Sequence, residues 1–397
     1  MSETMYDVVV VGGGPAGATA ASTLAKEGRN VLLLDRDGRI KPCGGAVPPR
    51  MLEDFDIPQS LLVAKARSAR MIAPSGRKVD MPVGEIGYVG MVDRDVFDEW
   101  LRERAASDGA ERRTGIFESV ERDGAGTHVC YRARRGAELQ KVRTKLVIGA
   151  DGARSKVARQ NIKDAEKMKC VFAYHEVIES PPANDLGFDP ARCDVFYQGK
   201  LSPDFYAWIF PHGHTSSIGL GSANKGFPLR ETVSDMRDEL GLDACKTVRK
   251  EGAPIPLKPL KRWDNGRDVL VAGDAAGVVA PASGEGIYYA MTCGRIAAEA
   301  ANEFVLSGQP AALRQARKRF MKEHGRVFWI LGMMQYFWYS SDKRRERFVD
   351  MCDDIDVQQL TWQAYMNKRL VRAKPLAHIK IFLKDTAHLL GLRPVTE

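Results

Sequence analysis

Three glycines near the N-terminus have the spacing of a turn that can bind phosphate groups. Gly12, Gly14 and Gly17 form the pattern G-x-G-x-x-G. In such a turn the first glycine permits a tight bend, the second lets a pyrophosphate approach the backbone, and the third lets a helix pack closely on a strand. Asp35 follows about 20 residues later, where a carboxylate can accept hydrogen bonds from ribose hydroxyls. This cluster predicts a dinucleotide site but does not distinguish a nicotinamide dinucleotide from a flavin dinucleotide.

Two later clusters decide between these cofactors. Gly149-Ala150-Asp151-Gly152 and Gly273-Asp274-Ala275-Ala276-Gly277 each follow an apolar run, and the second precedes Gly284-Glu285-Gly286-Ile287. A carboxylate at a strand end, next to glycines and a helix start, can bind a ribityl hydroxyl while backbone N–H groups face the flavin. Each cluster alone is compatible with an ordinary Asp–Gly turn. The three clusters in this order predict FAD.

Strands and helices are predicted around these clusters. A β-branched strand at 6–11, an Ala-rich helix at 16–26 and a strand at 30–34 form a βαβ unit. Further elements are predicted as a helix at 92–106, strands at 146–150 and 268–272, and a helix at 285–304. Short alternating segments broken by Pro between residues 170 and 260 predict an inserted antiparallel sheet.

The predicted fold class is therefore α/β. It combines a Rossmann-like FAD-binding domain, an inserted antiparallel β-sheet substrate domain and a C-terminal helical region. The predicted boundaries are 1–168 and 263–309 for the two parts of the FAD-binding domain, 169–262 for the substrate domain, and 310–397 for the basic, aromatic helical region.

Composition excludes several classes of protein. Hydrophobic residues make up 44% of the chain and charged residues 28%, which is ordinary for a globular protein. We find no apolar run long enough to span a bilayer and no secretory signal at the N-terminus. The 7 cysteines include no C-x-x-C pair, which favours a reducing compartment and argues against disulfides and a zinc site.

All of the net charge of +8 lies from residue 310 onward. Aromatic residues at 327–339 lead into Lys343-Arg344-Arg345. Beyond them, one helical face is apolar and another basic, which is typical of an interfacial helix: the apolar face has Leu376, Ile379, Leu383, Ala387 and Leu390, and the basic face has Lys380, Lys384 and His388. We expect a peripheral contact with a membrane surface, although these helices could instead only cap the substrate domain. No nucleic-acid-binding fold is recognised.

The three FAD clusters resemble the FAD-binding family typified by para-hydroxybenzoate hydroxylase. Two further stretches carry a narrower resemblance to the geranylgeranyl reductases, in particular to their chlorophyll and bacteriochlorophyll branch. They are Lys41-Pro42-Cys43-Gly44-Gly45-Ala46-Val47-Pro48-Pro49 and Pro203-x-x-Tyr206-x-Trp208-x-Phe210-Pro211. The similarity continues through residues 90–94 and 348–352 and covers nearly the whole chain.

The resemblance implies a set of FAD contacts. They are Gly12, Gly14, Pro15, Ala16, Gly17, Asp35, Arg36, Cys43, Gly44, Gly45, Ala46, Arg94, Asp151, Gly273, Asp274, Gly284, Gly286 and Ile287. The chain departs from the family at two places. The family more often has Glu where Asp35 stands, and plant members have a Lys-Cys pair where this chain has Ala280-Pro281-Ala282.

The reaction that the resemblance implies is stepwise reduction of three C=C bonds of a geranylgeranyl chain, which leaves a phytyl group. The expected substrate is geranylgeranyl-bacteriochlorophyll or geranylgeranyl diphosphate, and the expected location is the cytoplasmic side of a photosynthetic membrane. NADPH is the electron donor that the resemblance implies, and reduced ferredoxin is the alternative. Because no second G-x-G-x-x-G unit is present, no separate nicotinamide-binding domain is expected.

An isolated alkene has no carbonyl to polarise it, so its reduction requires a hydride, a proton source, a dry channel and an aromatic wall. Tyr206, Trp208 and Phe210 would share one face of a strand and could line that channel, or could be ordinary sheet core. Cys43 could donate the proton, position another group or be a structural thiol. The catalytic candidates are thus Cys43, Tyr206 and Trp208.

Other titratable residues receive no catalytic role. His175, His212 and His214 are interpreted as structural, and Glu285 as a helix-dipole or capping group. Three rival functions remain open: a flavin monooxygenase of the same fold, a prenyl-binding escort protein without redox chemistry, and a membrane-lipid prenyl reductase. The order of reductions and the oligomeric state are not predicted.

Overall fold

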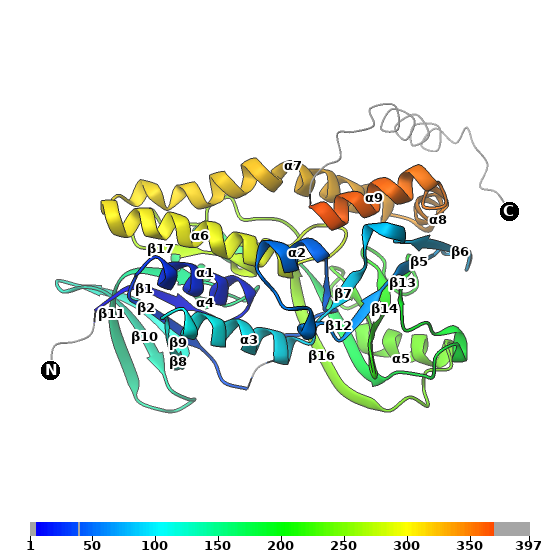
Figure 1. The fold of residues 1–397 in the computed structure, drawn as a ribbon, viewed down its shortest axis with the longest axis horizontal. Helices are drawn as coiled ribbons and strands as arrows, with labels where there is room; N and C mark the ends of the chain where they lie inside the picture. The colour runs from blue at the N-terminus through cyan, green and yellow to red at the C-terminus, as the bar shows by residue number, and fades with distance from the viewer. Residues whose placement is uncertain (1–4, 39, 369–397) are drawn as a thin grey trace. The chain divides into compact units, whose positions relative to one another are not determined.

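The computed structural model describes residues 5–38 and 40–368, and the chain divides into two units (Figure 1). The first comprises Met1–Lys41, Arg94–Cys170 and Pro254–Gly332; the second comprises Pro42–Asp93, Val171–Ala253 and Met333–Glu397. Residues 42–93, which the sequence analysis grouped with the FAD-binding domain, thus lie in the second unit.

The first unit is built on a sheet with the strand order β8-β2-β1-β11-β10-β9, with β17 pairing with β11. The strands are β1 (Met5–Val11), β2 (Val31–Asp35), β8 (Glu111–Thr114), β9 (Ile116–Asp123), β10 (Gly126–Arg132), β11 (Leu139–Gly149) and β17 (Val269–Val271). β1 runs parallel to β2 and β11, and β11 runs parallel to β17. In register, Val11 is level with Leu34 and Gly149, and Gly149 is level with Val271. The carboxyl ends of these strands therefore meet at one edge of the sheet.

Helices cover this sheet: α1 (Pro15–Lys26), α3 (Arg94–Ser107), α4 (Lys156–Asn161) and α6 (Ile287–Ser307), with the 3₁₀ turn η5 (Gly273–Ala276). Helix α1 begins at Pro15, whose fixed φ suits the first helical position, and continues with small residues. It packs closely on α6 (Figure 1), since a Cβ atom on Gly294 would lie only 2.2 Å from the carbonyl oxygen of Ala16.

The second unit contains a sheet with the order β16-β12-β15-β14-β13-β5-β6. Its strands are β5 (Ser68–Ile72), β6 (Lys78–Pro82), β12 (Cys170–Glu179), β13 (Arg192–Phe196), β14 (Ala207–His212), β15 (Thr215–Ser222) and β16 (Thr247–Pro256). A smaller sheet joins β3 (Ala46–Val47), β7 (Val89–Met91) and β4 (Ala64–Ala66). The helices are α2 (Pro49–Asp54), α5 (Leu229–Glu239), α8 (Asp342–Met351) and α9 (Ile355–Asn367).

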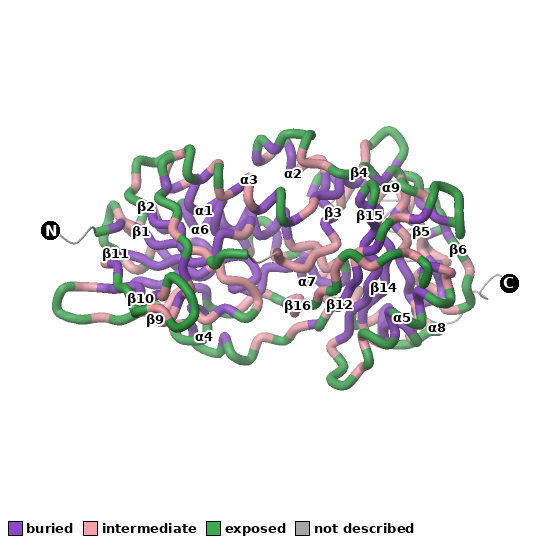
Figure 2. The backbone as a smooth tube through the Cα atoms, turned by 90° about the horizontal axis from the view of Figure 1, so that it is seen from below, coloured by how far each residue is buried: buried purple, intermediate pink, exposed green. Residues whose placement is uncertain are grey.

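The two faces of the large sheet in the second unit carry different side chains. One face is an apolar core in which Ile178, Ile218 and Leu220 of the sheet pack on Val233 and Met236 of α5. Figure 2 shows buried stretches (purple) along the central strands of both units. The opposite face carries the aromatic residues of β14, which are described with the site below.

Most of the predicted elements are present with shifted ends. The predicted βαβ unit is confirmed as β1-α1-β2, the helix predicted at 92–106 is α3, and the helix predicted at 285–304 is α6. The antiparallel sheet predicted between residues 170 and 260 is confirmed, because β15 pairs antiparallel with β12 and β14, and β14 with β13. The sheet continues into β5, which lies outside that range and runs parallel to β13. The sequence analysis did not assign β5 and β6, whose two-residue alternation is short.

The helix α7 (Arg314–Trp338) follows α6 and belongs to the basic, aromatic region predicted from residue 310. Within residues 5–38 and 40–368, no helix combines the length and the hydropathy needed to cross a bilayer. The amphipathic helix predicted around Leu376–Leu390 lies outside the described residues.

Candidate FAD site and the Cys43 loop

The glycine turn between β1 and α1 has the geometry that its spacing predicts. Gly12 has φ +104°, and a Cβ atom there would lie 2.4 Å from the carbonyl oxygen of Ala150. A Cβ atom on Gly17 would lie 1.8 Å from the carbonyl oxygen of Gly12. At Gly14, by contrast, a Cβ atom would meet nothing within 4 Å, and no side chain caps the helix that follows. The open side of the turn is therefore at Gly14, where the unpaired N–H groups of α1 can receive a pyrophosphate.

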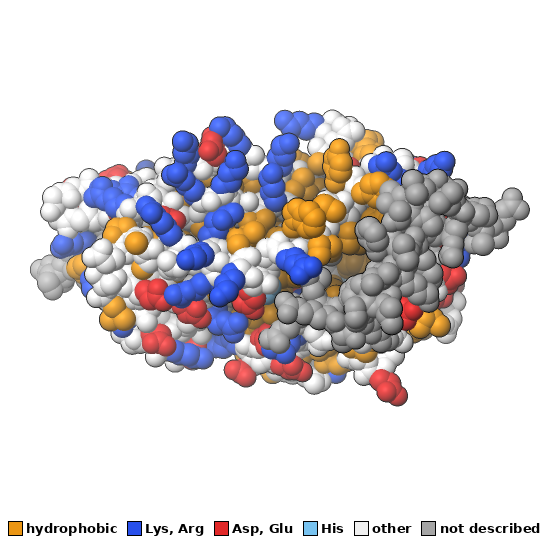
Figure 3. Space-filling model, turned by 90° about the horizontal axis from the view of Figure 1, so that it is seen from above, with side chains coloured by type: hydrophobic (Ala, Val, Ile, Leu, Met, Phe, Trp, Pro, Cys, Tyr) orange, Lys and Arg blue, Asp and Glu red, His pale blue; other side chains and the backbone are white. Residues whose placement is uncertain are grey.

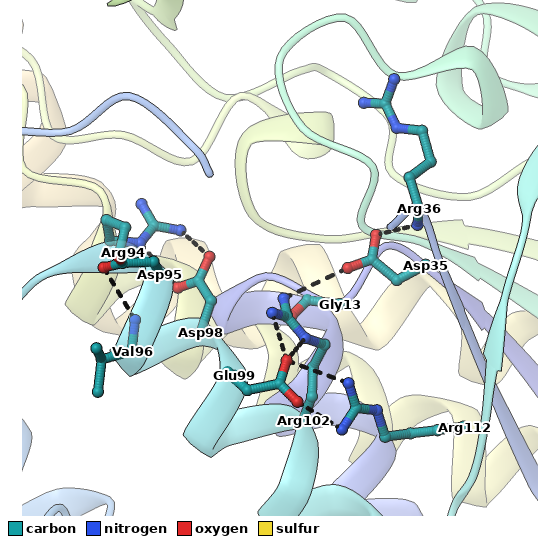
Figure 4. A network of polar contacts seen from close by, with 10 residues as sticks. All are labelled: Gly13, Asp35, Arg36, Arg94, Asp95, Val96, Asp98, Glu99, Arg102 and Arg112. Atoms are coloured by element: carbon teal, nitrogen blue, oxygen red, sulfur yellow. Dashed lines mark hydrogen bonds and ion pairs between the residues drawn. The ribbon is translucent and has the colours of Figure 1, made fainter. Parts of the chain in front are cut away.

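Asp35 ends β2 beside this turn and is held by three groups. Its Oδ1 accepts from the backbone N–H of Arg36 at 2.9 Å, its Oδ2 lies 3.5 Å from Nη1 of Arg102, and the backbone of Gly13 also donates to the carboxylate. Burial nevertheless raises the pKa of Asp35 above its ordinary value, against the effect of these hydrogen bonds. In Figure 4 the side chain of Arg36 extends away from the network, so that only its backbone contacts Asp35.

Arg102 is a site residue that the sequence analysis missed. It projects from α3, approaches the carbonyl oxygen of Gly13 at 3.4 Å and forms an ion pair with Glu99 at 2.7 Å (Figure 4). It thereby connects the glycine turn and Asp35 to helix α3. The spacing of Arg94, Asp98 and Arg102, each four residues apart on one helical face, was the signal that could have revealed it.

Arg94, an expected FAD contact, lies at the start of α3. Its Nε and Nη2 donate to the two carboxylate oxygens of Asp98 at 2.8 and 2.7 Å, and both side chains are buried (Figure 4). This two-point geometry fixes the guanidinium plane.

Asp274 lies in the first unit at the edge where β17 ends. It is buried in the turn η5, and Nζ of Lys41 forms an ion pair with its carboxylate. Gly286, which caps α6 without a side-chain bond, is close to it: a Cβ atom there would lie 3.8 Å from Oδ1 of Asp274. Gly273 and Gly284 have φ of +62° and +66°, and Ile287 is the buried first residue of α6. The structure thus gathers a carboxylate, a cation and a helix N-terminus.

Asp151 follows β11 at the same edge, but its side chain has local partners. It accepts hydrogen bonds from the hydroxyl of Ser155 and from the backbone N–H groups of Lys156 and Val157 at 2.7 and 3.2 Å. The carboxylate therefore stabilises the N-terminus of α4, as in an ordinary Asp–Gly turn. Burial raises its pKa.

The other predicted site residues lie in the second unit. Cys43, Gly44, Gly45 and Ala46 form a loop, called here the Cys43 loop, that enters β3. The Cys43 thiol is half-buried and accepts from the N–H of Gly45, with a donor–acceptor distance of 3.4 Å.

A row of aromatic side chains lies against the Cys43 loop. The ring centroids of Tyr206 and Trp208 are 5.9 Å apart, and those of Trp208 and Phe210 are 6.1 Å apart. Ala207 and Ile209 belong to the core on the opposite face, so the predicted alternation is confirmed. A Cβ atom on Gly44 would lie 3.0 Å from the Phe210 ring and 3.9 Å from Nε1 of Trp208. The structure thus brings the loop and the aromatic row together within one unit.

Comparisons with known proteins show which family the chain is similar to. A family model described as "FAD binding domain" matches residues 5–182. A geranylgeranyl diphosphate reductase of Rhodobacter capsulatus is 58% identical over 98% of both chains. A digeranylgeranylglycerophospholipid reductase of Methanocaldococcus jannaschii is 33% identical over 94% of this chain and 96% of its own. The crystal structure of a geranylgeranyl bacteriochlorophyll reductase-like protein from Thermoplasma acidophilum superposes with a TM-score of 0.79 at 23% identity, covering 94% of this chain and 99% of that one.

The matched FAD-binding domain and the relatives define an FAD-dependent oxidoreductase. Within that class, the chain belongs to the geranylgeranyl reductase family. The residues of the first unit fit the cofactor: the open space at Gly14 would take the pyrophosphate, Asp35 the ribose and Asp274 the ribityl chain.

Proposed function

We propose that this chain reduces the C=C bonds of a geranylgeranyl chain to give a phytyl group, with geranylgeranyl-bacteriochlorophyll as the substrate and NADPH as the electron donor. Full-length similarity to a geranylgeranyl diphosphate reductase supports a prenyl chain as the group that is reduced. The observation that carries the proposal is the aromatic row of Tyr206, Trp208 and Phe210 beside the Cys43 loop. These are the two stretches in which the sequence resembles the reductases.

The chemistry of the alkene explains why such a row is useful. Reduced FAD, when bound, supplies a hydride, and the second carbon of each double bond must receive a proton. Positive charge develops on the tertiary carbon as these events proceed, and aromatic faces stabilise a cation by about 0.5–2 kcal/mol per favourable contact. Buried aromatic rings also exclude water. Tyr206 and Trp208 are therefore assigned to the wall of the prenyl site.

Cys43 is assigned a role in the same site, either as the proton donor or as a group that positions the loop. Its thiol is half-buried and engaged only weakly, through sulfur, with the N–H of Gly45. A Cys43→Ser variant separates the two roles. Wild-type turnover in that variant would exclude proton donation by the thiol, whereas loss of turnover with normal flavin reduction by NADPH would support it.

A membrane surface is proposed as a partner because the substrate is a lipid-soluble pigment. Helix α7 exposes Trp329, Met333 and Tyr336, whose exposed fractions are 64%, 52% and 86%. The same helical face carries exposed cations one to four turns earlier, at Arg314, Lys318, Lys322 and Arg326. Figure 3 shows Lys and Arg side chains (blue) next to hydrophobic ones (orange) on the face that carries α7. Exposed aromatics flanked by cations suit the headgroup region of an anionic bilayer, such as the cytoplasmic face of a photosynthetic membrane.

The test uses the purified, FAD-loaded protein with geranylgeranyl-bacteriochlorophyll and NADPH. The proposal predicts products heavier by two, four and six hydrogens, ending with the phytylated pigment. Parallel incubations with geranylgeranyl diphosphate and with a geranylgeranylated glycerolipid identify the preferred head group. A product that contains added oxygen would instead establish a monooxygenase, and a purified protein without flavin would favour the escort function.

A further inference from the structure

His212 occupies an unusual position at the end of β14 in the second unit. Its ring is buried, with Nδ1 at 2.9 Å from Oδ1 of Asp93 and Nε2 at 3.1 Å from the carbonyl oxygen of Gly44. The ring therefore connects the residue that precedes α3 with the Cys43 loop. Asp93, His212 and the Gly44 carbonyl are called here the His212 bridge.

When Asp93 is ionised, both oxygens that face the ring can accept a hydrogen bond and neither can donate one. A neutral imidazole carries one N–H, so one of its nitrogens would direct a lone pair at an oxygen lone pair. An imidazolium carries two N–H groups and satisfies both oxygens at once. The geometry of the His212 bridge therefore matches the protonated ring, with the Asp93 carboxylate as its counter-ion.

The ring also packs tightly against the loop. Gly45 has φ +71°, and a Cβ atom there would lie 2.5 Å from Cε1 of His212 and 2.5 Å from the carbonyl oxygen of Val92. The carbonyl oxygen of Gly45 accepts a hydrogen bond from the N–H of Val92 at 3.0 Å, and the next residue, Ala46, pairs with Met91. The loop is thus attached to β7 after Gly45, whereas at Gly44 it is attached through His212.

We propose that His212 is a positioning residue which, as an imidazolium, joins Asp93 to the Gly44 carbonyl and so holds the Cys43 loop against the aromatic row. The hydrogen bond from His212 to the Gly44 carbonyl stabilises the position of Gly44 next to Phe210 and Trp208. The importance of the loop for turnover rests on the proposed function, but the attachment itself does not.

Other charged groups influence the carboxylate of the bridge. Arg249 of β16 and His214 in the turn after β14 both act on Asp93, and the Cys43 thiol lies in the loop itself. The pKa of Asp93 is lowered, chiefly by its hydrogen bond with His212, and further by Arg249 and His214. Asp93 therefore stays ionised at neutral pH and remains the counter-ion of the bridge.

The test is hydrogen exchange, measured on the full-length, FAD-loaded protein without prenyl substrate, with peptides that cover residues 42–48. His212→Gln and Asp93→Asn each remove the charged bond, and should lower the protection of the loop about tenfold or more relative to wild type. Glu239→Gln removes an exposed charge of the second unit that is not among the groups acting on Asp93, and it is the matched control, with wild-type protection expected.

¹⁵N NMR of the histidine rings provides a second readout, since it reports directly whether both nitrogens of His212 carry a proton at pH 7. A neutral ring, or unchanged protection in both His212→Gln and Asp93→Asn, would overturn the proposal. If only the proposed function is wrong, the loop still loses protection in these variants, but the wild-type protein reduces no prenyl chain.

Discussion

Two glycines of the same turn differ in what surrounds their α-carbons, so they should respond differently to the same substitution. Gly17→Ala places a methyl group 1.8 Å from a backbone oxygen, and should destabilise the first unit even without FAD. Gly14→Ala places it in open space at a φ of −75°, which any residue adopts, and should leave the FAD-free protein intact. Because that space is assigned to the pyrophosphate, FAD affinity should nevertheless fall about tenfold or more. Thermal unfolding with and without FAD, together with flavin titration, checks both. Wild-type FAD affinity in Gly14→Ala would contradict the assignment.

The aromatic character of Trp208, as distinct from its size, can be tested by paired substitutions. Trp208→Phe keeps an aromatic face, whereas Trp208→Leu keeps an apolar side chain without one. We expect Trp208→Leu to lower the rate of prenyl reduction about tenfold relative to Trp208→Phe, because a cation–aromatic contact contributes about 0.5–2 kcal/mol. FAD content and the unfolding temperature of the two variants serve as controls for folding. Equal rates would assign Trp208 to ordinary sheet packing.

At the scale of single residues, the sequence predicted where the glycine turn and Asp35 lie because their spacing has a direct geometric meaning. Gly12, Gly17 and Asp35 are placed as expected. The partners that hold them were not predictable in the same way. Arg102 reaches Gly13 across 89 residues of sequence, and His212 reaches Gly44 across 168. Such pairs depend on tertiary contacts that no local pattern encodes.

The elements of the first unit are joined by a buried carboxylate at the start of β17. Asp268 accepts from Arg122 at 2.6 Å, from Thr127 at 2.6 Å and from Asn265 at 2.9 Å, and thereby ties β9 and β10 to β17. Burial by itself would raise its pKa, but the hydrogen bonds outweigh that effect and lower it to about 2.

Asp268→Asn should therefore destabilise the protein, and by an amount that depends on pH. A carboxyl group whose pKa is depressed in the folded state stabilises that state above its unfolded pKa, by about 2 kcal/mol here. This contribution should fall to roughly half at pH 3 and vanish as the pH falls through the folded pKa. Denaturant unfolding of both proteins at pH 7 and pH 3 measures it. A difference between the two proteins that does not shrink at pH 3 would exclude the ionised network as its source.

At the scale of elements, the pattern of apolar residues was sufficient to predict strands that are buried on both sides and helices that are rich in small residues. Strand β1 and helices α1 and α6 are examples. It failed for β5 and β6, because their alternation is short and the parallel partner of β5, β13, lies more than a hundred residues further along the chain. Prediction of a mixed sheet requires that pairing to be known.

The whole molecule should bind anionic bilayers through the exposed face of α7. Trp329→Ser combined with Tyr336→Ser should weaken co-sedimentation with vesicles that contain anionic lipid by about tenfold or more, since each change removes an exposed aromatic anchor. Lys318→Gln with Lys322→Gln should weaken it too, and should lower its salt dependence. Val96→Ser, at a residue of α3 that is 56% exposed, is the matched control. If only removal of residues 376–397 abolishes binding, that segment and not α7 is the anchor.

The most direct measurement is anaerobic turnover of the purified, FAD-loaded chain with geranylgeranyl-bacteriochlorophyll and NADPH, followed by mass spectrometry of the pigment. We predict successive additions of two hydrogens until the phytylated pigment accumulates, with one NADPH consumed for each addition. A flavin that NADPH reduces fully while the geranylgeranyl chain keeps all of its double bonds would contradict a prenyl reductase acting on this pigment.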